Sequence, residues 1–327
     1  MAKAEELELV QEWDKVFPKS DKVDHEKVTF HNRFGITLAA DLYKPKDADG
    51  KLAAIAVSGP FGAVKEQSSG LYAQTMAERG FLTIAFDPSF TGESGGQPRR
   101  VSSPDINTED FSAAVDYLCC REDVDPERIA IIGICGWGGL AVNAAAIDTR
   151  IKATIASTSY VLTRVSTKGY FDAEDDPDKR REIRRSLNAQ RTADYASGNY
   201  QRAGGVVDPL PADAPQFVAD YYDYYKTPRG YHERSGNSTD GWNTTSSLSW
   251  TNTNLLQFAN EIESAVMVLH GSEAHSRYMG EGIFEQLEGD NKKLVIVDGA
   301  THCDLYDGGG KNAIPFDEIE SFLRENL

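Results

Sequence analysis

Cys135 lies in a glycine-rich stretch whose residue types and spacing suit the presentation of a nucleophile. An isoleucine-rich run, residues 128–132, leads directly into Gly133-Ile134-Cys135-Gly136-Trp137-Gly138-Gly139, and small residues that favour a helix follow. A strand, a tight glycine turn and a helix would place the thiol at the crest of the turn. A thiolate there can attack a carbonyl carbon. We therefore predict that Cys135 is a catalytic nucleophile.

The sequence of this turn does not match two common phosphate-binding patterns. A phosphate-binding P-loop ends in Gly-Lys-Ser/Thr, and a dinucleotide-binding turn usually belongs to the first βαβ unit, with an acidic residue about 20 positions later. Here Gly139 is followed by Leu140 and Ala141, and several strand candidates precede the turn, so neither pattern fits. A free cysteine that serves only as a small buried apolar residue remains the alternative for Cys135.

His302 is the predicted base. In enzymes that present a nucleophile on such a turn, the chain order is nucleophile, acid, histidine, with the histidine in a loop after the last strand. His302 follows the strand-like run 294–297 and a glycine-containing loop. Its imidazole could take the thiol proton and return it to a leaving group. A surface histidine is the alternative, and His270, at a strand end, is interpreted as structural.

The third member of the site should be an acid that orients the imidazole. Glu273 is the only carboxylate directly after the strand-like run 265–269, and we predict that it holds this role. The usual spacing would put an aspartate one residue later, where this chain has Ala274. Glu281 and Asp298 are therefore kept as substitutes.

An oxyanion hole needs two backbone N–H groups aimed at the developing negative charge. Gly136, the residue after the predicted nucleophile, supplies one of them. The other is expected from the loop 58–67, where Phe61 is the best donor. An ordinary turn between a strand and a helix is the alternative for that loop.

The elements that must position these residues alternate between apolar runs and helical stretches. This rhythm is typical of a mostly parallel central sheet with helices on both faces, the α/β class. Two leading runs with alternating polarity indicate an antiparallel hairpin at one edge. The predicted strands are 27–33, 36–43, 53–58, 82–86, 129–132, 151–157, 265–269 and 294–297, and the predicted helices are 67–79, 108–118, 278–287 and a last one from 315.

The rhythm breaks for about 100 residues, which is too long for an ordinary loop. We predict a lid or cap insertion at 161–260, after the sixth core strand, between the two parts of the core at 21–160 and 261–327. An amphipathic N-terminal helix is expected within residues 1–20.

Aromatic side chains near the predicted lid suggest a substrate-binding surface. The short helical stretch 216–225 is crowded with tyrosines, and Trp137 stands beside the nucleophile. Core packing is the alternative for such an aromatic stripe. The residues predicted to bind substrate are Trp137, Tyr221, Tyr222 and Tyr225.

Net charge and cysteine content restrict the expected classes of partner and cofactor. A formal net charge of −17 argues against nucleic acid and anionic membranes as partners. The four cysteines form neither a disulfide framework nor a CxxC metal pair, so a cytoplasmic location and no metal or organic cofactor are expected. The expected partner is a small-molecule ester or thioester, and self-association is left open.

At this point the chain resembles the dienelactone hydrolase-like branch of the α/β-hydrolases, which carries a cysteine at the nucleophile turn, and it is similar to bacterial hydrolases and fungal polyketide acyltransferases. The motifs that carry the resemblance are Gly59-Pro60-Phe61-Gly62 with Lys65-Glu66-Gln67, the run 86–96, Gly133-Ile134-Cys135 and Gly299-Ala300-Thr301-His302. The resemblance implies an α/β-hydrolase fold, Cys135 as nucleophile and His302 as base. Two departures are Trp137, where the family usually has glycine, and the missing aspartate near Glu273.

By the same resemblance, Glu66 is a candidate modulator of the thiol. Its alternative is a helix N-terminal position, which favours a carboxylate. The predicted function is a hydrolase that cleaves a small carboxylic ester, lactone or thioester through an acyl-cysteine intermediate. An acyltransferase using the same cysteine and histidine, and a non-catalytic ligand-binding protein, remain the alternatives.

Overall fold

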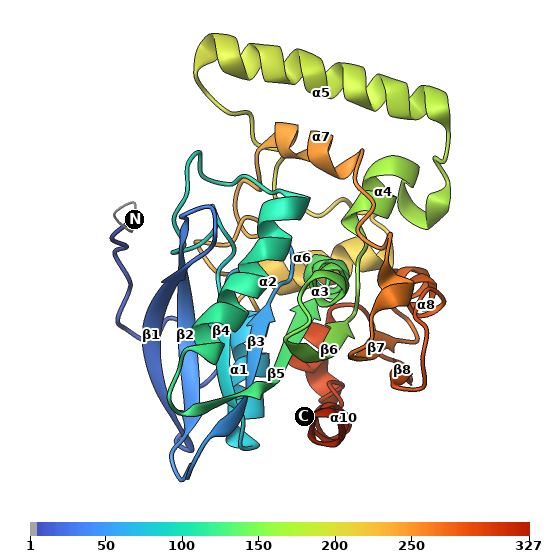
Figure 1. Ribbon diagram of the computed structural model, residues 1–327. Helices are drawn as coiled ribbons and strands as arrows, with labels where there is room; N and C mark the ends of the chain where they lie inside the picture. Colours follow the sequence, from blue (N-terminus) through green and yellow to red (C-terminus); the bar gives the residue numbers. More distant parts are fainter. Residues whose placement is uncertain (1–4) are drawn as a thin grey trace.

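The computed structural model describes residues 5–327, and one eight-stranded sheet forms its centre (Figure 1). The strand order is β1-β2-β4-β3-β5-β6-β7-β8. β1 and β2 form the antiparallel hairpin at one edge, β2 also pairs antiparallel with β4, and the remaining neighbours are parallel. The strands are β1 Val23–His31, β2 Thr37–Pro45, β3 Leu52–Ser58, β4 Leu82–Phe86, β5 Val124–Ile134, β6 Ile151–Ser157, β7 Ala265–Gly271 and β8 Lys292–Val297.

Helices cover both faces of the sheet, as the sequence predicts. Alternate side chains of the central strands enter different cores: Ile55 and Val57 pack with α1 and α10, whereas Ala54 and Ala56 pack with α2 and α3. This alternation follows from the two-residue repeat of a strand. The core helices are α1 Ser68–Glu78, α2 Pro104–Cys119, α3 Gly136–Ile147, α8 Arg277–Phe284, α9 Asp304–Asp307 and α10 Phe316–Asn326.

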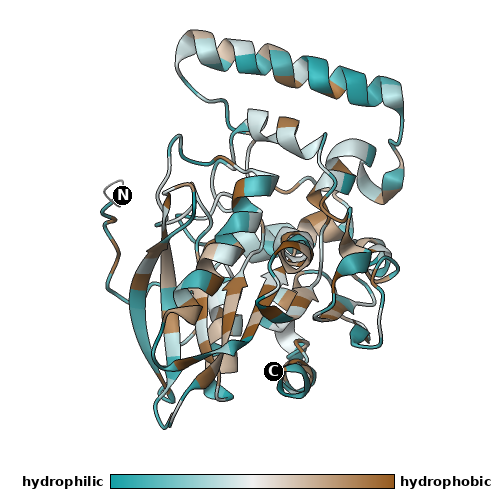
Figure 2. Ribbon diagram, in the orientation of Figure 1, coloured by the Kyte–Doolittle hydropathy of each residue, from teal (hydrophilic) through white to brown (hydrophobic). Residues whose placement is uncertain are grey.

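A helical insertion follows the sixth strand, as predicted, and connects β6 to β7. Its longest helix, α5, lies apart from the sheet at the top of Figure 1, and Figure 2 shows that it is mostly hydrophilic. Asp176 caps the start of α5 by accepting a hydrogen bond from the Asp178 N–H, and Gly198 ends it with a left-handed φ of 70°. The helices of the insertion are α4 Leu162–Lys168, α5 Pro177–Ser197, α6 Gln216–Lys226 and α7 Ser247–Trp250, with short 3₁₀ turns at Tyr170–Asp172, Thr244–Ser246 and Ala259–Glu261.

The predicted N-terminal helix is wrong. Residues 5–22, which we name the N-terminal segment, contain no helix, and residues 1–4 lie outside the described part of the chain. The Val10 N–H donates to Glu93 Oε1 at 2.6 Å, and the Val16 N–H donates to the Glu66 carbonyl at 3.0 Å. Core groups therefore take up backbone donors that a helix would have paired internally.

Within residues 5–327, no helix combines the length and the apolar composition that crossing a bilayer requires.

Candidate active site

Cys135 stands on a sharp turn between β5 and α3, with φ 59° and ψ −123°. A positive φ is costly for a residue with a side chain, so the surroundings must hold it. The Cys135 N–H donates to the Ser157 carbonyl, and the Cys135 carbonyl accepts from the N–H groups of Gly138 and Tyr160, each at 2.9 Å. These three bonds fix the turn and direct the thiol toward the carboxyl edge of the sheet.

Glycines beside Cys135 are required by close contacts. A Cβ on Gly133 would lie 2.0 Å from the Trp137 carbonyl oxygen, and one on Gly136 would lie 2.7 Å from the Phe61 Cβ. The second contact shows how closely the loop after β3 approaches the turn.

The two predicted oxyanion donors meet at the thiol. Hydrogen bonding from the backbone N–H groups of Gly136 and Phe61 lowers the pKa of the Cys135 thiol, so both donors face the sulfur. Side chains of the insertion hold the Phe61 loop: Asn237 Nδ2 donates to the Phe61 carbonyl at 2.6 Å, and the Phe61 ring packs edge-on against Trp242 at 4.8 Å. The structure thus brings Cys135, Phe61 and Gly136 together as the sequence predicts.

His302 is buried near the same site and is held by hydroxyl groups. Its Nδ1 lies 2.6 Å from the Ser276 hydroxyl oxygen and 3.1 Å from that of Thr158. Its Nε2 lies 3.0 Å from the Tyr306 hydroxyl oxygen. Because Nδ1 faces two neutral oxygens, a hydrogen on Nδ1 would leave Nε2 free to accept a proton.

Glu273 does not hold the role predicted for it. Its side chain is exposed and its carboxylate accepts a hydrogen bond from Ser272 at 3.4 Å, not from His302. The substitutes fail as well, since Glu281 pairs with Arg277 and Asp298 is exposed. The loop after β7 carries Ser276 inward instead, so a hydroxyl occupies the position of the acid.

Burial keeps both predicted catalytic groups, Cys135 and His302, neutral at rest. It raises the pKa of the Cys135 thiol, against hydrogen bonds from Tyr306, Gly136, Phe61 and Tyr221 that favour the thiolate. It also holds the pKa of His302 well below its usual value, and repulsion from His275 and His270 adds to the effect. A neutral thiol beside a neutral imidazole is therefore the resting pair.

Cys135 opens into a cavity of about 320 Å³. Most of its wall comes from the insertion, and none of the described residues that line it is charged. The lining consists of Phe61, Cys135, Tyr160, Leu162, Val165, Ser166, Tyr170, Gly205, Val206, Tyr221, Asn237, Trp242 and Tyr306.

Of the four aromatic residues predicted to bind substrate, only Tyr221 lies on the cavity wall. Trp137 points into the core, where its ring packs edge-on against Phe86 and Phe111 at 5.8 and 5.3 Å. Tyr225 is buried behind Tyr221, with 6.4 Å between the ring centroids. Tyr222 lies outside the lining, because successive residues of α6 point in different directions.

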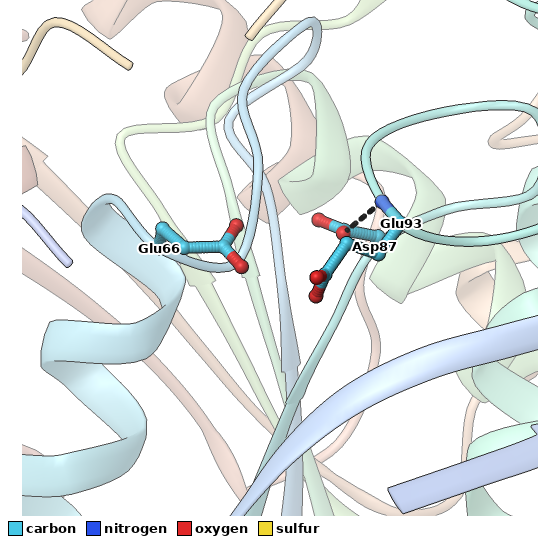
Figure 3. A group of neighbouring side chains, drawn as sticks. All are labelled: Glu66, Asp87 and Glu93. Carbon is cyan, nitrogen blue, oxygen red and sulfur yellow. Dashed lines mark hydrogen bonds between the residues drawn. The ribbon is translucent and has the colours of Figure 1, made fainter. Parts of the chain in front are cut away.

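Glu66 belongs to a buried ion cluster with Asp87 and Glu93 (Figure 3). The Lys65 ammonium contacts all three carboxylates, at 2.7, 2.9 and 2.6 Å respectively. Three carboxylates so close together could hold a cation, but the chain supplies that charge itself through Lys65.

The roles considered for Glu66 do not match its contacts. Burial disfavours its charge, but Lys65 and Arg234 outweigh burial and hold the pKa of Glu66 well below its usual value. Its side chain pairs with these two cations and not with the Cys135 thiol. It also precedes the N-cap of α1, which is Gln67.

Sequence reasoning missed Tyr306, Ser276 and Thr158. A signal existed for Tyr306, because it stands four residues after His302, the spacing that brings side chains together on one helical turn. No comparable signal marks Ser276 or Thr158, which reach His302 from the segments that follow β7 and β6 respectively.

The sheet order, the strand–turn–helix at Cys135 and the histidine after β8 define the class: the protein has the α/β-hydrolase fold. Among solved structures, the α/β-hydrolase GrgF from Penicillium sp. sh18 superposes with a TM-score of 0.76 at 21% identity, covering 93% of this chain and 99% of its own. The crystal structure of hypothetical protein PA2218 from Pseudomonas aeruginosa superposes with a TM-score of 0.95 at 54% identity, covering 99% of this chain and 100% of its own.

The chain belongs to the X-Pro dipeptidyl-peptidase (S15) family, whose profile matches residues 35–304. In sequence it is 55% identical to the uncharacterized protein PA2218 of Pseudomonas aeruginosa, over 98% of this chain and 86% of that protein. It is 35% identical to the uncharacterized protein YcjY of Escherichia coli, over 93% of this chain and 99% of that protein. A fungal thiohydrolase, aneE of Aspergillus aculeatus, is 30% identical over 54% of each chain.

Proposed function

We propose that the protein hydrolyses a small, uncharged carboxylic ester, lactone or thioester through a covalent acyl-Cys135 intermediate. The observation that carries the proposal is the thiol itself: Cys135 stands on a turn with positive φ, faced by two backbone N–H groups, at the wall of a cavity without charged lining. When a carbonyl oxygen takes the place near those N–H groups, they are aimed at the charge that develops on it.

The chemistry proceeds in two steps. The Cys135 sulfur bonds to the carbonyl carbon while its proton leaves toward His302, and the leaving alcohol or thiol departs with a proton returned by the imidazole. Water then attacks the acyl-thioester with His302 as base. Cys135 leaves as the thiol and the carboxylic acid is released.

The lining of the cavity favours an ester or thioester over an X-Pro dipeptide. A dipeptidyl substrate presents a positively charged amino terminus, which requires a carboxylate or strong acceptor when it is buried. The described lining offers hydroxyls, an amide and apolar side chains, but no carboxylate. The thiohydrolase similarity of aneE points the same way.

Short-chain p-nitrophenyl esters, matched thioesters and an X-Pro p-nitroanilide form the test panel, with acid-quenched intact-mass detection of an acyl adduct. We expect Cys135→Ala and His302→Ala to lose about three orders of magnitude or more in kcat/KM on the esters. The exposed-thiol control Cys120→Ala should keep wild-type activity and the adduct.

Undiminished ester hydrolysis by Cys135→Ala would refute the covalent mechanism. Preferential cleavage of the X-Pro p-nitroanilide would instead refute the proposed substrate class. The unpaired state of all four cysteines supports the further proposal that the protein works in the cytoplasm, where thiols stay reduced.

A further inference from the structure

Tyr306 occupies the place where a proton must travel between the two reacting groups. It lies on α9, and its hydroxyl oxygen is 3.0 Å from His302 Nε2, the nitrogen that would accept the thiol proton. Its side chain also lines the cavity that contains Cys135, and Tyr306 comes first among the hydrogen-bonding groups that lower the pKa of the thiol. The hydroxyl therefore contacts His302 and faces the cavity into which the thiol opens.

Packing fixes the Tyr306 ring in this position. The ring is fully buried, and it meets His302, Tyr224 and Tyr225 edge-on with centroid separations of 5.3, 5.0 and 6.1 Å. A ring enclosed in this way has few other rotamers available. Its hydroxyl is held against His302 Nε2, at the wall of the cavity that contains the thiol, before any substrate binds.

We propose that Tyr306 is a catalytic residue that relays the proton from Cys135 to His302. The inference rests on the proposed function, since it concerns the same acylation step. As the sulfur bonds to the carbonyl carbon, the S–H proton passes to the Tyr306 oxygen while the Tyr306 O–H proton passes to His302 Nε2. The hydroxyl is regenerated, and the same path in reverse returns a proton to the leaving group.

The two transfers must occur together. Burial, reinforced by the electrostatic effect of Cys135, raises the pKa of Tyr306 well above its usual value, so a free tyrosinate is strongly disfavoured. A stepwise path through that anion would be slow. A concerted path keeps the tyrosine neutral throughout and needs no further reactant.

The opposite role can be distinguished by experiment. A hydroxyl that only caps the resting histidine would obstruct direct contact between His302 and Cys135, and its removal would raise the rate. Under the relay, Tyr306→Phe should instead lower kcat by about 100-fold with little change in KM. The matched control is Tyr224→Phe, which makes the same change in the same ring cluster but outside the cavity lining.

Solvent isotope measurements test the relay in the wild type itself. The dependence of kcat on the D₂O fraction during acylation should be curved, as expected for two moving protons, and linear in the residual activity of Tyr306→Phe. A linear dependence in the wild type would overturn the relay. So would an undiminished or faster Tyr306→Phe enzyme, or an equal loss in Tyr224→Phe.

Alkylation by iodoacetamide supplies a readout that needs no substrate. Loss of the Tyr306 hydrogen bond should move the pH midpoint of Cys135 alkylation upward in Tyr306→Phe and leave it unchanged in Tyr224→Phe. An unchanged midpoint in Tyr306→Phe would also overturn the relay. If Cys135→Ala abolishes hydrolysis while Tyr306→Phe does not reduce it, the relay fails and the proposed function stands.

Discussion

His302 is held at Nδ1 by the hydroxyls of Ser276 and Thr158 where comparable enzymes place a carboxylate. A carboxylate would stabilise the imidazolium that forms during the reaction. Neutral hydroxyls stabilise it far less, and burial already disfavours the charged ring. The imidazole therefore stays neutral over a wide pH range, and under the proposed mechanism the thiol gives up its proton only when a substrate is in place.

This arrangement predicts an unusual acid limb in the pH profile. Because the pKa of His302 lies well below its usual value, kcat/KM for an uncharged ester should hold its plateau as the pH falls below about 6.5. It should decline only when the buried ring finally takes up a proton. Rates measured from pH 4 to 9 provide the check.

A half-maximal rate at or above pH 6.5 would contradict this expectation and would imply a stabilised imidazolium. Ester concentrations far below KM are needed so that the rates report the free enzyme.

The insertion has two roles that both involve Asn237: it lines the cavity, and it holds the loop that carries Phe61. Asn237 lines the cavity, and its side chain and backbone donate to the carbonyls of Phe61 and Gly62 at 2.6 and 3.0 Å. A Cβ on Gly62 would lie 2.4 Å from Asn237 Oδ1, so the two segments are closely fitted. The insertion thereby holds the loop that carries Phe61, the proposed oxyanion donor.

We expect Asn237→Ala to release the Phe61 loop and reduce kcat by about 100-fold, the magnitude seen when an oxyanion donor is lost. KM should change much less, because the amide holds the loop rather than the reacting group. Asn199→Ala, an exposed change in the same insertion, is the matched control. Equal kcat in Asn237→Ala and the wild type would show that the loop holds itself.

The buried ion cluster connects three parts of the molecule: the core, the insertion and the N-terminal segment. Lys65, Glu66 and Glu93 belong to the core, Arg234 of the insertion pairs with Glu66 at 2.8 Å, and the N-terminal segment reaches Glu93 through the Val10 N–H. Charges removed from water are stable only while each remains paired. Removing one partner should therefore loosen all three parts together.

Lys65→Met should lower the free energy of unfolding by about 3–5 kcal/mol at pH 7, because it takes the buried carboxylate of Asp87 from its ion-pair partner and weakens the charge balance of Glu66 and Glu93. Without the ammonium the carboxyl pKa values rise in the folded state, so this state binds more protons than the unfolded chain as the pH falls. The deficit relative to wild type should shrink between pH 7 and about pH 4. Urea unfolding at several pH values measures it.

The surface ion pair Lys179–Glu174 provides the control, and Lys179→Met should cost no more than about 1 kcal/mol. A Lys65→Met deficit that is small, or that grows on acidification, would contradict the account of the cluster.

The sequence was sufficient to predict the strands of the sheet and the tight turn at Cys135. Strand and helix periodicities located the core elements, and the glycines around Cys135 marked the turn because steric contacts demand them. The partner of His302 was not predictable, since the course of the loop after β7 decides which side chain faces inward, and it leaves Glu273 exposed and brings Ser276 to the imidazole. The helix predicted for the N-terminal segment was wrong because the apolar spacing there suits a helix, while the backbone donors bind distant core groups.

Because Asn237 both lines the cavity and holds the Phe61 loop, changes in the insertion should affect substrate preference and turnover rate together. Replacing the insertion would reshape the cavity, but it would also remove the hydrogen bond from Asn237 that holds the Phe61 carbonyl. A variant with a new substrate preference would therefore turn over more slowly until a second substitution held the Phe61 loop again. Substrate selectivity and turnover rate are therefore expected to change together in this fold.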